Sequence, residues 1–203
     1  MMTAFFPTDP KKIRDRIKRY ERAFKDPHHD DGAGKRFLLG PLYMLMGDLP
    51  GALKSYTWYK KTFPDDCCEA FNHLCWTLAL LRSDDEKTAK AKLRELIFDN
   101  LYIVPIFFGE APANHGFRHF SNWSEAAYIL EGPKDELFAL WNEAEASWLK
   151  AQWHSPELQV DLAKYIELQR KLDKTSGAEA RSKIMKEADR VARGQNHLRV
   201  VKA

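Results

Sequence analysis

Apolar residues recur at helical spacing along most of the chain, and no stretch shows the strict alternation that is typical of a β-strand. Residues 10–25 show the pattern clearly, because their apolar positions form one stripe and their other faces are charged. Asp9 can cap this helix, Pro10 suits its first turn, and Asp26-Pro27 ends it. The pattern as a whole predicts an all-α protein of about ten helices.

A spaced series of small and aromatic residues lies within residues 36–64 and predicts two short helices, 34–47 and 50–63, folded back on each other. Gly40 lacks a side chain and would let a partner helix approach closely, and Gly47 with Asp48 would make the turn. Ala52 and Tyr56 are four residues apart, so they lie on one face of the second helix. The series predicts a tightly packed antiparallel hairpin that ends at Pro64.

This series resembles the tetratricopeptide repeat, in which Trp-x2-Leu-Gly-x2-Tyr is followed by Ala-x3-Phe and then by Pro over about 34 residues. Here Arg36 stands in the Trp position and Tyr56 in the Phe position, and Pro41 departs from the pattern. A second, degenerate unit repeats the alanine signature at Ala89 and Leu93. The resemblance implies about two repeats over residues 33–108, packed with flanking helices into one right-handed superhelical or bundle body. It also implies a non-enzymatic role in protein–protein interaction.

Further helices are expected on both sides of the second unit, and no linker divides the chain, so residues 1–203 are expected to form one domain. An aspartate of Pro64-Asp65-Asp66 would cap a helix running to about Arg82, and Ser83 to Glu86 forms a capping box for the next. Leu101–Phe108 is expected to be a short buried helix. The C-terminal helices over residues 121–194 are expected at 121–132, at 133–153, from Pro156 onward, and from a capping box at Ser176 to a stop at Gly194.

The resemblance also implies where a partner would bind, because the first helix of each repeat usually lines a concave groove that takes a peptide. The corresponding positions here are apolar, and an open groove of this kind would expose a large hydrophobic patch. Either the flanking helices fill the groove or an amphipathic helix of a partner does, and the number of extra helices favours filling by the chain itself. The groove positions are Phe37, Pro41, Met44, Leu45, Phe71, Leu74, Leu78 and Leu81.

Residues 109–123 are rich in Gly, Pro and Asn and predict one long loop, a kind of segment that often carries function in compact domains. The loop contains His115, Arg118 and His119, which together could bind an anion such as a phosphorylated ligand. The two histidines would suit a metal only on a helix, and Gly116 between them argues against one. A small enzyme or a metal site in this loop stays open as an alternative function.

Two other clusters of potential metal ligands give no metal site. His28 to Asp31 are neighbours in one loop, whereas a structural zinc site takes four well-spaced ligands. Cys67, Cys68, His73 and Cys75 crowd within nine residues, and buried cysteines acting as small hydrophobic residues are the expected outcome. We therefore assign no catalytic residue, no metal and no cofactor.

Composition narrows the remaining classes. The chain has 203 residues, 44% hydrophobic and 30% charged, which is ordinary for a globular protein. Its net charge of +3 does not by itself indicate nucleic acid, although the basic helix of residues 10–25 keeps a nucleic-acid-associated factor as an alternative. The tryptophans Trp123, Trp141, Trp148 and Trp153 are expected in the core. Three cysteines and the lack of a long apolar run predict a cytoplasmic protein without a membrane span or signal peptide.

Overall fold

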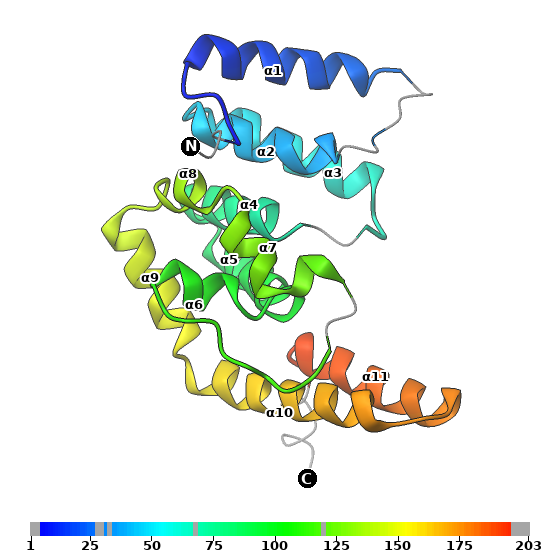
Figure 1. Cartoon of the computed structure of the whole chain (residues 1–203). Helices are drawn as coiled ribbons and strands as arrows, with labels where there is room; N and C mark the ends of the chain where they lie inside the picture. The colour runs from blue at the N-terminus through cyan, green and yellow to red at the C-terminus, as the bar shows by residue number, and fades with distance from the viewer. Residues whose placement is uncertain (1–4, 27–30, 32–33, 67–68, 119–120, 196–203) are drawn as a thin grey trace.

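The structure is a computed structural model that describes residues 5–26, 31, 34–66, 69–118 and 121–195. Within these ranges the chain is helical, with eleven α-helices, one 3-10 turn and no strand, as the sequence predicts. The bounds of the elements, which Figure 1 labels, are α1 Pro10–Ala23, α2 Lys35–Leu45, α3 Leu49–Thr62, α4 Ala70–Arg82, α5 Glu86–Asp99, α6 Ile103–Phe107, η1 Asn122–Ser124, α7 Ala126–Glu131, α8 Lys134–Phe138, α9 Glu143–Trp153, α10 Pro156–Lys174 and α11 Ala178–Ala192.

Packed helix pairs form the body of the molecule. The pairs α2–α3 and α4–α5 are joined by short turns and pack against each other through α2, α3 and α4. Helix α1 lies on α2 as the outermost layer at one end, and the pair α10–α11 lies at the other end, where α11 contacts α5 (Figure 1). Helices α6, α7 and α8 fill the space beside α4. The chain therefore runs from one end of the molecule to the other.

The first pair is held by the close contact that the sequence predicts. A Cβ atom built on Gly40 would lie 2.3 Å from Cε1 of Tyr56, so only glycine lets the ring pack flat on α2. Ala52 is fully buried at the same crossing. Gly47 makes the turn with φ of +70°, and the Asp48 side chain caps α3 by accepting from the Gly51 amide. These residues confirm the predicted helices and turn.

The caps of the second pair differ from the prediction. Helix α4 starts at Ala70, and the carboxylate of Glu69, rather than an aspartate of residues 65–66, accepts hydrogen bonds of 2.8 Å from the amides of Phe71 and Asn72. The hydroxyl of Tyr128 on α7 donates to the same carboxylate at 2.7 Å. Asp85, not Ser83, caps α5. Glu69 thereby joins the start of α4 to a helix almost sixty residues further along the chain.

The C-terminal half also corrects several boundaries. The single helix predicted over 133–153 is two helices, α8 and α9, and Asn142 opens α9 with a capping box to Glu145. Gly177, with φ of +91° and no side-chain bond, precedes α11 in place of the predicted serine cap. Ser121 caps the 3-10 turn, and Glu125 precedes α7. The buried short helix α6, the start of α10 at Pro156 and the end of α11 before Gly194 agree with the prediction.

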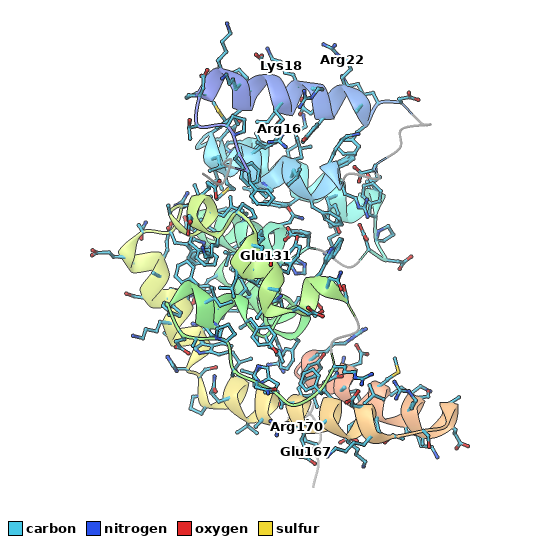
Figure 2. The ribbon with its side chains drawn as sticks, viewed as in Figure 1. Arg16, Lys18, Arg22, Glu131, Glu167 and Arg170 are labelled. Carbon is cyan, nitrogen blue, oxygen red and sulfur yellow. The ribbon has the colours of Figure 1, made fainter. Side chains whose placement is uncertain are left out.

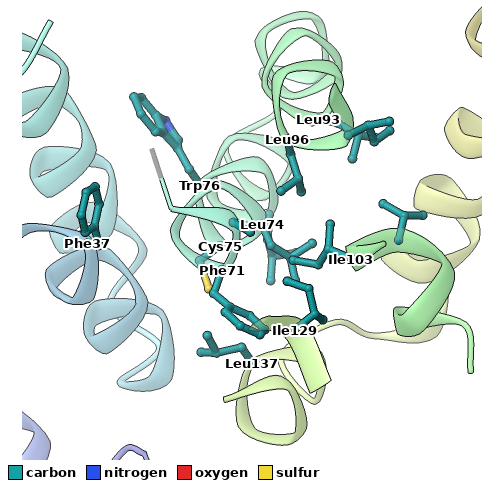
Figure 3. Close-up of a cluster of buried hydrophobic side chains, with 14 of the residues drawn as sticks. Phe37, Phe71, Leu74, Cys75, Trp76, Leu93, Leu96, Ile103, Ile129 and Leu137 are labelled. Atoms are coloured by element: carbon teal, nitrogen blue, oxygen red, sulfur yellow. The ribbon is translucent and has the colours of Figure 1, made fainter. Parts of the chain in front are cut away.

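Helices α7 and α8 pack against the apolar positions of α4 that were predicted to line a groove. Phe71, Leu74 and Leu78 are almost fully buried, and Ile129 of α7 and Leu137 of α8 pack into the same cluster (Figure 3). Among the described residues, no helix combines the length and the apolar character that crossing a bilayer would require.

Candidate functional site

The apolar positions predicted to meet a partner lie in the core. Phe37 packs edge-on against Trp123, with ring centroids 5.2 Å apart, and Met44 is also buried. Phe71 lies against Gly132, where an added Cβ would come within 2.4 Å of its ring, and Leu74 and Leu78 have no exposed surface. In this structure these five side chains belong to the core, although Phe37 and Phe71 also line a pocket of about 300 Å³.

Residues 109–118 of the predicted loop contain no helix and run beside α10 (Figure 1), and the 3-10 turn η1 occupies Asn122–Ser124. The ring of His115 packs on Tyr102 at 5.1 Å between centroids, and its carbonyl accepts a hydrogen bond from Arg170. Arg118 is exposed and lines a small pocket of about 60 Å³ together with Asp99. His119 lies outside the described residues, so the structure does not test the anion-binding set as a whole.

Of the cysteine and histidine clusters, only part is described. Cys67 and Cys68, and residues 28–30 of the other cluster, lie outside the described residues. Cys75 is fully buried on α4, and burial raises the pKa of its thiol well above the usual range. A protonated, buried thiol is unreactive, so Cys75 acts as a core residue.

The remaining residue of that cluster, His73, opens onto a cleft with a charged lining. This histidine cleft has a volume of about 580 Å³ and lies between the end of α3, α4, α5 and the end of α11. Its aromatic walls come from Tyr59, Phe63 and Trp76, and its charged lining includes Lys92, Glu95 and Asp99. Its described lining includes none of the residues that were predicted to line the groove.

The His73 side chain is placed by α4 at the floor of the cleft and is only 4% exposed. Burial, helped by the positive charge of Lys92, lowers its pKa to about 3, so the imidazole is neutral at physiological pH. Its Nδ1 atom lies 3.5 Å from Oδ2 of Asp99, and its Nε2 atom lies 3.9 Å from Oε2 of Glu95. Nδ1 makes no hydrogen bond within the described part of the chain.

Asp99 has the opposite shift. Desolvation and the neighbouring charge of Glu95 raise its pKa to about 7, against the smaller opposing effect of Lys92. About half of its side chain, 52%, remains exposed to solvent, so the carboxyl group can exchange a proton with water. His73 and Asp99 together place a neutral imidazole beside a carboxyl group that titrates near neutral pH.

Lys92 fixes the other side of the cleft. Its ammonium group pairs with Glu95 and lies 4.1 Å above the ring of Trp76, a cation–π contact. Trp76 in turn stacks on Tyr56, with ring centroids 5.0 Å apart and planes 4° from parallel. The charged lining therefore rests on the same aromatic stack that joins α2, α3 and α4.

The described part of the cleft lacks two arrangements used in bond-breaking chemistry, a group of metal ligands and a hydroxyl or thiol beside the histidine. The two carboxylates approach opposite nitrogens of the imidazole ring, so they cannot converge with it on one ion, and no group of metal ligands occurs in the described ranges. The described lining has no serine, threonine or cysteine that a histidine could activate as a nucleophile. The cleft offers aromatic walls, a hydrogen-bonding floor and a charged rim.

Sequence reasoning singled out His73 but missed Lys92, Glu95 and Asp99. The sequence could have indicated these residues. Two antiparallel helices that turn near residues 84–86 bring residue 73 of the first helix beside residues 95–99 of the second. Scans of the chain against protein-family models, curated proteins and solved structures found no significant match. The case for a function therefore rests on the geometry of the sites.

Proposed function

We propose that the chain is a non-enzymatic helical scaffold of the tetratricopeptide-repeat type that binds a protein or peptide partner in the cytoplasm. The observation that carries the proposal is the histidine cleft, a half-open, aromatic-walled and charge-rimmed surface without a serine, threonine or cysteine in its described lining. Protein interfaces are enriched in aromatic anchors surrounded by a polar rim. The repeat-like arrangement is supported by the pairs α2–α3 and α4–α5 and by the Gly40–Tyr56 contact.

Two cations of the cleft, Arg193 and Lys92, have partners within the chain. Arg193 pairs with Asp189 at 3.0 Å, and Lys92 is held between Glu95 and Trp76. Because Lys92 is already oriented by its neighbours, contact with a partner there would cost little side-chain entropy. The exposed cations Lys60 and Arg193 lie at opposite walls, one on α3 and the other after α11, so they can be changed without disturbing the core.

The proposal is tested by capture with the immobilised full chain, followed by calorimetry with each purified captured protein. We expect a saturable partner whose binding is lost in the double variant Lys60→Glu with Arg193→Glu. The matched control is Lys150→Glu with Lys171→Glu, which makes the same change of charge at exposed positions outside the cleft lining. Equal binding by both variants would remove the cleft from the proposal, and the absence of any saturable partner would contradict the scaffold function.

A further inference from the structure

Positive charge is concentrated in two helices of the N-terminal part. Residues 10–25 and 49–62, which contain α1 and α3, carry eleven of the 32 Lys and Arg residues but two of the 29 Asp and Glu residues. The rest of the chain therefore has an excess of acidic residues, although the net charge of the whole is +3. Lys18 and Arg22 project from the side of α1 that faces away from α2 (Figure 2).

An apolar pocket opens within this basic region. This anchor pocket has a volume of about 260 Å³ and lies between the end of α1, α2 and α3. Phe24 and Trp58 form one wall, with ring centroids 4.7 Å apart, and Leu39 and Tyr43 form another. Gly51 is required for its shape, because a Cβ atom there would lie 2.5 Å from the ring of Tyr43.

The polar groups of the anchor pocket are few and are placed at its edge. The Tyr43 hydroxyl donates a hydrogen bond to the carboxylate of Glu21, so this hydroxyl group has a partner without a ligand. Lys25 and Lys54 are exposed lining residues, one from each side of the opening. An occupant should therefore place an apolar group inside and negative charge around the rim.

A nucleic acid or a membrane fits these features less well. A nucleobase in an apolar pocket would leave its hydrogen-bonding edges unpaired. Insertion into a membrane needs an exposed apolar face, whereas the apolar stripe of α1, Ile13, Ile17 and Tyr20, is buried on α2. An apolar side chain of a protein has no hydrogen-bonding edge to satisfy in the pocket, and its binding does not require an exposed apolar face on α1.

We infer that the anchor pocket is the docking site for an acidic amphipathic helix of a partner protein. One bulky apolar side chain of that helix enters between Phe24, Trp58 and Tyr43, and its flanking carboxylates pair with Lys25 and Lys54. The remaining cations of α1 steer the acidic helix toward the surface. The inference rests on the protein-binding function proposed above but not on the histidine cleft, from which the anchor pocket is separate.

The test is selection of a displayed library of helical peptides on the full chain, followed by affinity measurement for the enriched peptides. We expect enrichment of peptides with several Asp or Glu residues around one Trp, Phe or Leu. The double variant Lys25→Glu with Lys54→Glu should weaken their binding at least about tenfold and flatten its dependence on salt. Replacing the apolar anchor of a peptide by alanine should weaken binding by a similar factor.

Three controls separate the outcomes. The variant Lys150→Glu with Lys171→Glu should bind the peptides like the wild type, and so should the histidine-cleft variant Lys60→Glu with Arg193→Glu. Loss of binding in the cleft variant would assign the peptides to the other site and overturn this inference alone. A selection that enriches no acidic peptide would overturn it as well. So would tight binding of a polyuridine oligonucleotide or of phosphatidylserine vesicles, without peptide binding, if the variant Lys25→Glu with Lys54→Glu abolished it. Circular dichroism verifies that each variant is folded.

Discussion

At the scale of single residues, Gly40 provides a test in which the sign of the effect is informative. Alanine is normally about 1 kcal/mol more favourable than glycine inside a helix. At this position the added Cβ would lie 2.3 Å from the ring of Tyr56, which is buried and stacked on Trp76. We expect Gly40→Ala to lower the free energy of unfolding by about 1–3 kcal/mol, measured by urea denaturation.

A double-variant cycle isolates that contact. Tyr56→Leu removes the ring atoms nearest to Gly40, so Gly40→Ala should cost clearly less in the Tyr56→Leu background than in the wild type. An unchanged or higher urea midpoint for Gly40→Ala alone would show that the two helices do not depend on this notch.

His73 and Asp99 should make opposite contributions to the pH dependence of stability. An unfolded histidine takes up a proton near pH 6.5, whereas folded His73 stays neutral down to about pH 3, so its contribution to stability is lost as the pH falls. Folded Asp99 keeps its proton up to about pH 7 while the unfolded carboxyl ionises near 3.8, so its contribution is lost as the pH rises. The two effects partly cancel in the wild type.

Single variants should separate these two contributions. Between about pH 6.5 and pH 5 the His73→Gln variant should lose about 2 kcal/mol less stability than the wild type. Asp99→Asn should lack the decline in stability between about pH 4 and pH 7, with a smaller effect because the side chain is half exposed. Urea unfolding across this range measures both slopes, and pH profiles parallel to the wild type would refute the assigned shifts.

At the scale of elements, one arginine attaches the α10–α11 pair to the rest of the molecule. Arg94 on α5 donates hydrogen bonds to the carboxylate of Asp161 on α10 and to the carbonyls of Val191 and Ala192 at the end of α11. The Asp161 side chain is buried. Arg94→Met leaves the carboxylate without this cation, so we expect a loss of about 3 kcal/mol and faster hydrogen exchange in α11. Mass spectrometry of deuterium uptake measures the second effect.

The control for Arg94 is an exposed ion pair on α11. Lys183 pairs with Glu179 at 2.8 Å, but both side chains are largely in solvent, so Lys183→Met should change stability by less than about 0.5 kcal/mol. Combining Arg94→Met with Asp161→Leu should recover much of the loss, because no buried charge remains. A loss as large in the double variant as in the single one would mean that packing, not the buried charge, dominates.

Helix existence could be predicted from the sequence, but several helix ends could not. The stripe of α1 and the Gly-Asp turn of α2–α3 are local patterns, and both are confirmed. The Glu69 carboxylate, which caps α4, also accepts a hydrogen bond from the Tyr128 hydroxyl on α7. At the break between α8 and α9, Arg82 on α4 donates a hydrogen bond to the Leu140 carbonyl. These partners are distant in sequence, so a local reading of Asp65, Asp66 or Pro133 cannot find them.

At the scale of the whole molecule, the candidate sites depend on contacts between distant segments. The histidine cleft needs α4, α5 and α11 together, and the anchor pocket needs α1 beside α3. The sequence identified the basic helix and His73, but not the carboxylates that meet His73 or the aromatic wall made by Phe24 and Trp58. Among the predicted groove residues, Phe71, Leu74 and Leu78 are buried in the core cluster that Ile129 of α7 and Leu137 of α8 also join.

This packing leads to a prediction about cooperativity. Leu137 of α8 is fully buried beside Phe71 of α4, so the predicted single domain should unfold in one transition that includes both halves of the chain. Leu137→Ala should lower stability by about 2–5 kcal/mol and shift the transitions seen by tryptophan fluorescence and by far-ultraviolet circular dichroism equally. Two separate transitions, with only the later helices affected by Leu137→Ala, would instead show that residues 34–99 fold independently and that α7 and α8 merely cover a groove that can open.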